Sequence, residues 1–321
     1  AGVAGSARPS AVPAHSPAGP IPIGAAAPAA RQARANELGV VPVLMYHRIL
    51  PKSQVSLDRT TKELRGEFER LAKGGYVPVT AAEFVSGRID IPAGGHPVVL
   101  SFDDGHPSHF ALDANGVPRP DTVVGMLMDV SRRYPGFRPV ATFFVNREPF
   151  LLGGQASAGL RWLLQHGFEI ANHTLNHPDL SRMSQKQVQQ EIGRDERQIV
   201  QLTGVHAVTL AFPFGAIPKK AGWAARMAGE YDFKGAFLAG WRPSGSPFAE
   251  DFEPMAIPRI RSEGKIKEED CKRFCSTAWL DWLDKNPDKR YTSDGDRSVI
   301  SFPKAEEERL DDGFRAQGRS Y

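Results

Sequence analysis

The chain has 321 residues, enough for one large domain with a complete core or for two small ones. Its 40 Lys and Arg residues nearly balance its 37 Asp and Glu residues, so the charge gives no reason to expect nucleic acid or an anionic membrane as a partner. No apolar run approaches the ~20 residues that a membrane-spanning helix needs. We therefore expect no nucleic-acid partner and no transmembrane segment.

Residues 1–36 differ in composition from the rest of the chain. Ala, Pro, Gly and Ser make up 26 of these 36 residues, and none is aromatic. Such a segment cannot bury enough apolar surface to order itself, so we predict a flexible linker over 1–36 and a folded domain over 37–321. The chain begins at Ala1 rather than Met, which favours a removed signal peptide and a secreted or cell-envelope location, although a trimmed recombinant chain would look the same.

From residue 37 onwards, short apolar runs alternate with helical patterns. The apolar runs predict strands at 41–47, 97–104, 139–146, 168–173, 208–215, 233–240 and 255–260. The helical patterns lie at 61–73, 121–134, 159–167, 184–204 and 268–286. Ser184 and Gln187 form a capping box at the start of the fourth helix. This alternation predicts an α/β fold with a parallel sheet covered by helices, most simply a closed or nearly closed (β/α) barrel.

Several chemistry-bearing residues stand at or just beyond the C-terminal ends of predicted strands. These residues are His47, Asp103, Asp104, Asn146, His173, Phe214 and Arg259. In a βα barrel the C-terminal strand ends share one face, where active sites form. We therefore expect these residues to converge in space.

The pair Asp103-Asp104 ends an apolar strand and needs an explanation. Two adjacent carboxylates repel each other unless a nearby cation compensates their charge. A cap for a following helix would explain only one of the two Asp residues. His173 and His177, four residues apart, could reach one ion, and with one carboxylate they complete a three-ligand site with open positions. The second carboxylate is then free to accept a proton. The same ligand set occurs in non-haem iron oxygenases, which usually carry a His-x-Asp pair that is absent here.

The segments "LSFDDG", "ATFFVN" and "ANHTLNHPDL" resemble the signature segments of the NodB-homology polysaccharide deacetylases, carbohydrate esterase family 4. The segments "VPVLMYHRI", "AFPFG" and "AIPRI" resemble the circularly permuted branch of that family, which includes poly-N-acetylglucosamine deacetylases. The similarity spans residues 41–261. It implies a distorted (β/α) barrel of the NodB-homology type.

The resemblance also implies roles for individual residues. Asp104, His173 and His177 would bind a divalent metal, usually zinc, although this ligand set also suits Co²⁺, Ni²⁺ or Fe²⁺. Asp103 would be the catalytic base, and the backbone N–H of Phe214 would bind the oxyanion.

Two further roles follow from departures from the pattern of non-permuted members. Non-permuted members take the acid from a histidine in a late L-x-H motif, but no histidine follows His206 here. The resemblance to the permuted branch implies that His47 is the acid, because it matches the histidine of that branch's M-Y-H segment. Ala211 stands where non-permuted members carry an arginine, and we expect Arg259 to hold Asp103 instead, the alternative being that Arg259 is a surface residue.

The function implied is hydrolytic, metal-dependent deacetylation of N-acetylhexosamine units in an extracellular or cell-wall glycan. The acetylated glycan is the expected partner, and we expect a monomer. Two alternatives stay open at this point: an esterase that removes O-acetyl groups from a polysaccharide, and a catalytically inactive glycan-binding homologue.

Three features outside these motifs carry weaker expectations. Cys271 and Cys275 favour a local disulfide in an exported protein, the alternative being two free thiols on one helical face. The remaining histidines are interpreted as surface residues, although His106 and His109 follow the Asp pair closely enough to contact a substrate. The extension after about residue 284 is either a strand pair covering the barrel or a wall of the substrate groove.

Overall fold

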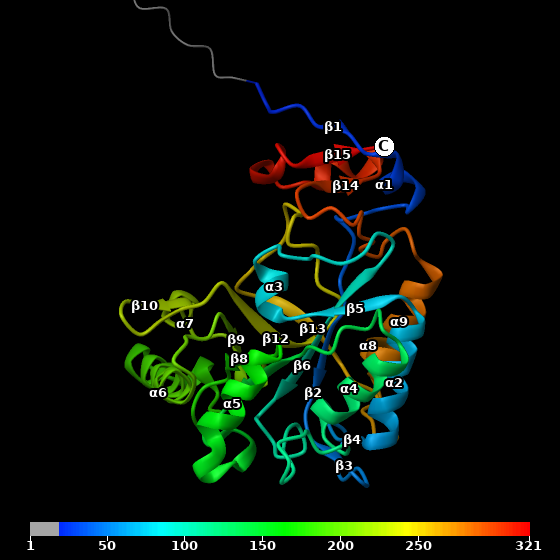
Figure 1. The fold of residues 1–321 in the computed structure, drawn as a ribbon. Coiled ribbons are helices and arrows are strands. Elements are labelled where there is room, and N and C mark those ends of the chain that lie inside the picture. Colours follow the sequence, from blue (N-terminus) through cyan, green and yellow to red (C-terminus); the bar gives the residue numbers. More distant parts are fainter. Residues whose placement is uncertain (1–18) are drawn as a thin grey trace, which may run out of the picture.

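The structure is a computed structural model, and it describes residues 19–321. Seven parallel strands close into a barrel (Figure 1), confirming the predicted fold. Around the barrel they follow the order β2 (Val43–Tyr46), β13 (Ile257–Arg261), β12 (Gly235–Trp241), β9 (Thr209–Ala211), β8 (Glu169–Asn172), β7 (Thr142–Val145) and β6 (His96–Asp103). The ring closes because β2 pairs with both β13 and β6. An eighth strand, β5 (Tyr76–Val79), pairs with the first half of β6.

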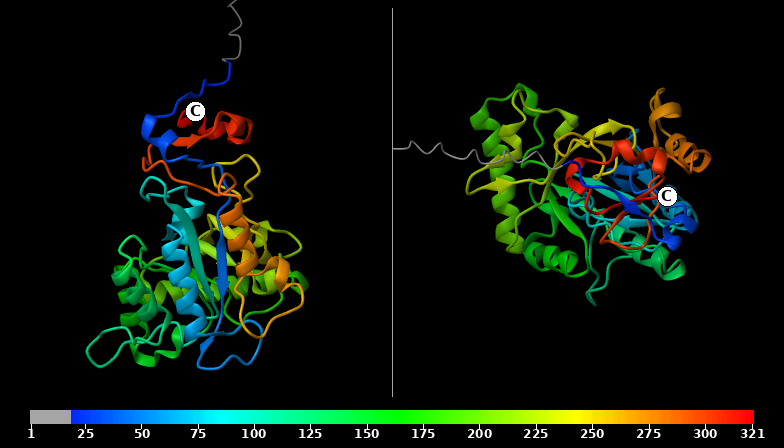
Figure 2. Two further views of the ribbon diagram at one scale, coloured as in Figure 1. Left: turned by 90° about the vertical axis from the view of Figure 1, so that its right-hand side faces the viewer. Right: turned by 90° about the horizontal axis from the view of Figure 1, so that it is seen from above.

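Helices lie around the outside of the strands, as the view from above shows (Figure 2). The longer ones are α2 (Thr61–Lys73), α4 (Val123–Arg133), α5 (Ala156–Gln165), α6 (Gln185–Thr203) and α9 (Ser276–Lys285). The shorter ones are α1 (Pro28–Gln32), α3 (Ala81–Val85), α7 (Gly222–Ala225) and α8 (Cys271–Phe274). The predicted capping box of α6 is present, because the Ser184 side chain accepts from the Gln187 N–H and the Gln187 side chain bonds in return.

Two apolar clusters fill the molecule, one on each side of the barrel wall. The outer cluster joins the strands to the helices and includes Leu100 and Phe102 of β6. The inner cluster includes Val99 of the same strand. Successive residues of a strand point to opposite faces, so Ser101 and Asp103 follow Val99 on the inner face. The inner face of β6 therefore changes from apolar to ionisable towards its C-terminal end.

A small parallel sheet covers the end of the barrel where the strands begin (Figures 1 and 2). It contains β1 (Gly24–Ala25), β15 (Gly318–Ser320) and β14 (Ile300–Phe302). Phe302 is fully buried in the inner cluster. The C-terminal extension thus packs over the end of the barrel where the strands begin.

The predicted linker differs from the structure over residues 24–36. Here β1 pairs with β15, α1 follows, and Ala30 and Ala35 are buried. The partner strand lies almost 300 residues further along the chain, and its pairing supplies the backbone hydrogen bonds that local composition did not predict. The linker prediction for residues 1–18 lies outside the described residues.

The predicted helix 268–286 is two helices, with Cys275 in an extended conformation between α8 and α9. Cys275 forms the expected disulfide with Cys271 and pairs with Arg261, the last residue of β13. This pairing explains the break, because a residue in a β-bridge cannot continue a helix. Two short two-stranded sheets complete the fold, β3 (Ile49–Leu50) with β4 (Arg59–Thr60) and β10 (Arg226–Met227) with β11 (Tyr231–Asp232). Across residues 19–321, every helix is too short or too polar to cross a membrane.

Candidate active site

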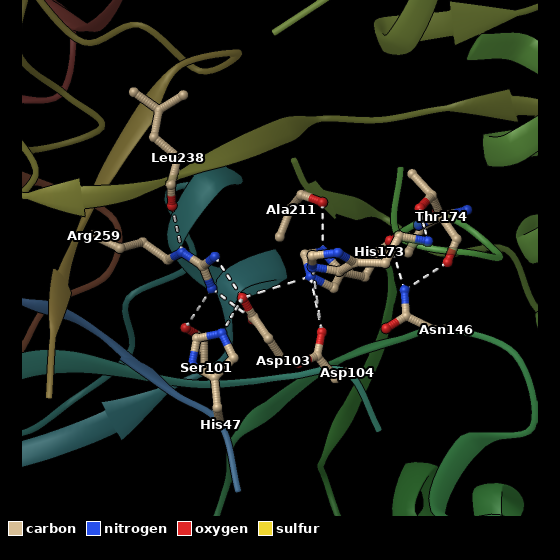
Figure 3. A network of polar contacts seen from close by, with 12 residues as sticks. His47, Ser101, Asp103, Asp104, Asn146, His173, Thr174, Ala211, Leu238 and Arg259 are labelled. Carbon is tan, nitrogen blue, oxygen red and sulfur yellow. Dashed lines mark hydrogen bonds and ion pairs between the residues drawn. The ribbon is translucent and has the colours of Figure 1, made fainter. Parts of the chain in front are cut away.

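Asp103 and Arg259 form a buried ion pair inside the barrel (Figure 3). Two guanidinium nitrogens of Arg259 donate to the two carboxylate oxygens of Asp103 at 2.7 and 2.8 Å. Arg259 also donates to the Leu238 carbonyl oxygen at 2.6 Å and to Ser101 Oγ at 3.1 Å. Burial alone would raise the pKa of Asp103, but the charge of Arg259 holds it well below the usual range of an aspartate. Asp103 is therefore an ionised carboxylate in a fixed orientation.

Asp104 faces a different set of partners, although it is the next residue. Its φ of 79° and that of Gly105, 63°, turn the chain sharply at the end of β6. Asp104 Oδ1 lies 3.3 Å from His173 Nε2 and 3.6 Å from His177 Nε2. One ligand atom from each of these three residues lies within 4.8 Å of the others. The turn therefore separates two adjacent carboxylates, one for Arg259 and one for the histidines.

The tautomer of His173 fits metal binding. Its Nδ1 lies 2.7 Å from the carbonyl oxygen of Ala211, and because a carbonyl only accepts, this nitrogen must carry the hydrogen. Nε2 is buried without a hydrogen-bond partner in the described part of the chain, so its lone pair faces Asp104 and His177. Burial alone would lower the pKa of His173, but Asp103 and Asp104 raise it. A cation would satisfy the same lone pair and the same two negative charges.

The turn that carries both histidines is held from several sides. Asn146 at the end of β7 donates to the carbonyl oxygens of His173 and Thr174, at 2.8 and 2.7 Å. Asn172 Oδ1 accepts from the Thr174 N–H, and Thr174 Oγ1 accepts from the His177 N–H. Thr174 has a φ of 65°, which a β-branched residue adopts only under constraint. These hydrogen bonds supply that constraint and direct both rings to Asp104.

Two buried acids of α6 support the turn, and the sequence analysis did not identify them. Asp195 accepts from the His173 N–H at 3.1 Å, and Glu196 accepts from the Asn172 side chain at 3.0 Å. Both lie on the buried face of α6, among the positions that the apolar pattern alone would fill with hydrophobic residues. An acidic pair on an otherwise apolar helix face was the available signal.

His47 follows β2 and lies on the other side of Asp103. Its Nε2 is 3.7 Å from Asp103 Oδ2, and His173 Nε2 is 3.8 Å from the same oxygen. Burial is the main influence on His47 and lowers its pKa, against the opposing charge of Asp103. Asp103 Oδ2 therefore lies between His47, the candidate acid, and His173, a candidate metal ligand.

Phe214 lies in the Pro213–Gly215 turn that follows β9. The residue is 69% exposed, and its ring meets the His177 ring edge-on with the ring centroids 4.7 Å apart. Its φ is 61°, and its backbone N–H donates to no acceptor among the residues that the structure describes. The structure thus brings all seven sequence-predicted residues to one end of the barrel.

Two of the histidines interpreted as surface residues are buried. His96 is 9% exposed at the start of β6, at the end of the barrel remote from Asp103. His109 is fully buried, and its Nε2 lies 2.6 Å from the carbonyl oxygen of His47. His109 therefore cannot contact a substrate directly. The expectation from the sequence that it could do so is wrong for this residue.

Residues 90–231 match the family model described as polysaccharide deacetylase. This match covers 142 of the 321 residues, so this part of the chain is similar to the polysaccharide deacetylase family. A curated relative, the chitooligosaccharide deacetylase of Rhizobium leguminosarum bv. phaseoli, is 33% identical over 115 residues, which are 36% of this chain and 42% of that protein. The matches span from 22% to 47% of the curated relatives' own lengths.

Two solved structures have a fold similar to that of this chain. The deacetylase PplD of Streptococcus pyogenes has a TM-score of 0.55 at 18% identity, over 74% of this chain and 98% of that one. A de-N-acetylase from Aggregatibacter actinomycetemcomitans has a TM-score of 0.52 at 17% identity, over 76% and 99%. At these identities the likeness concerns the fold.

Proposed function

We propose that this protein is a metal-dependent hydrolase that removes acetyl groups from N-acetylhexosamine units of a glycan. The observation that carries the proposal is the separation of the two adjacent carboxylates. Asp103 is fixed by Arg259, whereas Asp104 faces His173 and His177. A protein that only bound glycans would have no use for this division.

Asp104, His173 and His177 would hold the metal, and the bare Nε2 of His173 is the group that most needs it. Zn²⁺ fits one carboxylate and two imidazoles with open positions left for water and substrate. The bound metal would polarise the acetamide carbonyl and bring the pKa of a bound water towards ~7. Cobalt, nickel and iron accept the same donor set.

Asp103 is the base in this proposal. Its ionised carboxylate can accept the proton of a water that attacks the acetyl carbon, and Arg259 keeps it oriented throughout. The unpartnered N–H of Phe214 would donate to the oxygen of the tetrahedral species, as an oxyanion hole does.

His47 is the acid. When the carbon–nitrogen bond breaks, the departing amine needs a proton, and an imidazole next to Asp103 can supply it. The products are acetate and a free amine on the sugar. His47 follows β2, which comes before the Asp pair in the chain. In the barrel, β2 lies between β13 and β6 and closes the ring. This arrangement suits a circularly permuted member of the family.

Location and domain organisation belong to the same proposal. A glycan polymer outside the cell is the natural substrate, so we place the protein outside the cytoplasm or in the cell envelope, as a monomer. The barrel together with the C-terminal extension that covers it forms one catalytic domain over residues 37–321, and residues 24–36 pack onto that domain.

An acetate-release assay tests the proposal, with metal content measured on the same sample. N-acetylglucosamine oligomers should release acetate, and acetylated xylan should release far less. The Asp103→Asn protein is the matched control, because it keeps the shape of the site and the metal ligands. Release from xylan alone would indicate an O-acetyl esterase. Absence of release from either, in a metal-loaded sample that still binds the oligomers, would indicate a binding protein.

A further inference from the structure

His109 lies in the loop between the Asp pair and α4 and touches the backbone of His47. Its Nε2 is 2.6 Å from the His47 carbonyl oxygen, so Nε2 carries a hydrogen and donates. Its ring stacks on Phe143 at 5.9 Å and meets Phe102 and Phe150 edge-on at 5.4 and 6.2 Å. Three aromatic rings from three segments therefore fix the direction in which this hydrogen points.

The side chain of His47 has no equivalent support of its own. Its Nδ1 is buried without a hydrogen-bond partner in residues 19–321, and its Nε2 is 3.7 Å from the nearest Asp103 oxygen. A metal-binding or catalytic histidine is usually oriented by a hydrogen bond to its second ring nitrogen. In the absence of that bond, the position of the His47 ring depends on its backbone.

The loop of His109 holds that backbone at two points. Besides the bond to the His47 carbonyl, Ser108 Oγ accepts from the Ile49 N–H at 3.0 Å. The loop is in turn fixed to the first turn of α4, where the N–H of Val124 donates to the His109 carbonyl at 3.2 Å. The backbone on both sides of residue 48 is therefore tied to a rigid helix.

We propose that His109 is a positioning residue, which holds the backbone of His47 so that its ring can protonate the leaving amine. This inference rests on the proposed function, because it assumes that His47 is the acid. The requirement is geometric, since a displacement of about 1 Å can cost on the order of 100-fold in rate.

The surroundings of His109 suit this role. Burial lowers the pKa of His109 to about 4, so the ring is neutral at physiological pH. Its Nδ1 is buried without a partner among the described residues, and the whole residue is 0% exposed. A neutral, enclosed imidazole is a hydrogen-bond donor of fixed direction and not a proton source for the substrate.

The test compares His109→Phe, which keeps an aromatic ring but has no N–H, with His109→Gln, whose amide places an N–H at a similar distance from the backbone. His96→Phe is the matched control, because His96 is a buried histidine near a backbone carbonyl (Nδ1 to Tyr291 O, 3.0 Å) at the far end of the barrel. Each protein is assayed for metal content, for acetate release from an N-acetylglucosamine oligomer, and for hydrolysis of 4-nitrophenyl acetate. The nitrophenolate leaves without protonation, so the ratio of the two rates isolates the acid.

We expect His109→Phe to keep its metal and its KM, and to lose on the order of 10- to 100-fold in kcat on the oligomer. The ratio of oligomer to nitrophenyl ester turnover should fall in His109→Phe, recover in His109→Gln, and stay at the parent value in His96→Phe. In a His47→Ala background, His109→Phe should cost nothing more on the oligomer, because the two changes act on one step.

Three results would overturn the inference. They are an unchanged kcat in His109→Phe, an equal loss on both substrates, and a full additional loss in the His47→Ala background. Failure of the proposed function is distinguishable from these, because the parent would then release no acetate, or His47→Ala would turn over the oligomer as the parent does. If His109→Phe does not fold, His109→Leu, which also lacks the N–H, gives the non-additivity in the two backgrounds, with His96→Leu as its control.

Discussion

Replacing Glu37 by Gln should stabilise the protein at neutral pH. Glu37 is 3% exposed, and its carboxyl group accepts from the backbone N–H groups of Ser301 at 3.0 Å and Asp294 at 3.3 Å. Tyr291 donates its hydroxyl to the same group at 3.3 Å. Burial, and after it the charge of Asp294, raise the pKa of Glu37 to about 9. The folded protein therefore carries a proton here at pH 7.

The magnitude follows from the pKa of Glu37 in the two states. The ordinary value is 4.5, so at pH 7 the unfolded chain has lost this proton and folding must take it up. Because the folded pKa is the higher one, the associated stability is complete below about pH 4.5 and is lost as the pH rises towards 9. At about 1.4 kcal/mol per pH unit, roughly 3 kcal/mol is lost by pH 7. Gln avoids this loss but gives up one acceptor, which costs about 1 kcal/mol, leaving a gain of about 2 kcal/mol.

Urea unfolding followed by tryptophan fluorescence, from pH 4.5 to pH 8, measures the difference. Glu37→Gln should be about 2 kcal/mol more stable than the parent at pH 7 and slightly less stable at pH 4.5. Glu308→Gln, at an exposed position of the same C-terminal extension, should match the parent throughout. A Glu37→Gln protein that is less stable than the parent by the same amount at every pH would refute the reasoning.

Three further predictions concern the site. His177→Ala should lose both metal and acetate release, and full metal content in this protein, measured by mass spectrometry, would rule out the ligand triad. Asp103→Asn should keep its metal and lose ~10²–10⁴-fold in turnover, whereas Asp104→Asn should bind the metal more weakly. Equal metal content in those two proteins would contradict the division between the carboxylates. His47→Ala should keep its metal and its unfolding free energy but release little acetate. Parent-like turnover by this protein would mean that the proton comes from another group.

The barrel was predictable because its signals are local. Each strand is a short run of apolar residues, and the chemistry-bearing residues follow the runs directly, as Asp103 and Asp104 follow β6. Even the partner of Asp103 could be inferred, since the chain has Ala211 where an arginine would otherwise serve and Arg259 ends another strand. The convergence of these residues follows from parallel strands alone. Their catalytic roles stay predictions until the variants are measured.

What the sequence did not predict depends on contacts between distant segments. The burial of His109 comes from Phe102, Phe143 and Phe150, which lie in three different parts of the chain. The sequence analysis did not predict strand β5, because Pro78 interrupts its four-residue apolar run. A proline within such a run is typical of an edge strand or a loop. β5 is indeed such an outer strand, since within residues 19–321 it pairs only with β6.

The first and last strands of the described chain, β1 and β15, lie side by side at the covered end of the barrel (Figure 1). The candidate site lies beyond the opposite ends of the strands, where Asp103 and Arg259 stand. An affinity tag, a carrier protein or a bead attached near either of these two strands would therefore point away from the substrate. A protein immobilised in this way would present the end of the barrel that carries the candidate site to a solid polymer such as a wall fragment. A tether at that end would obstruct the approach of the polymer.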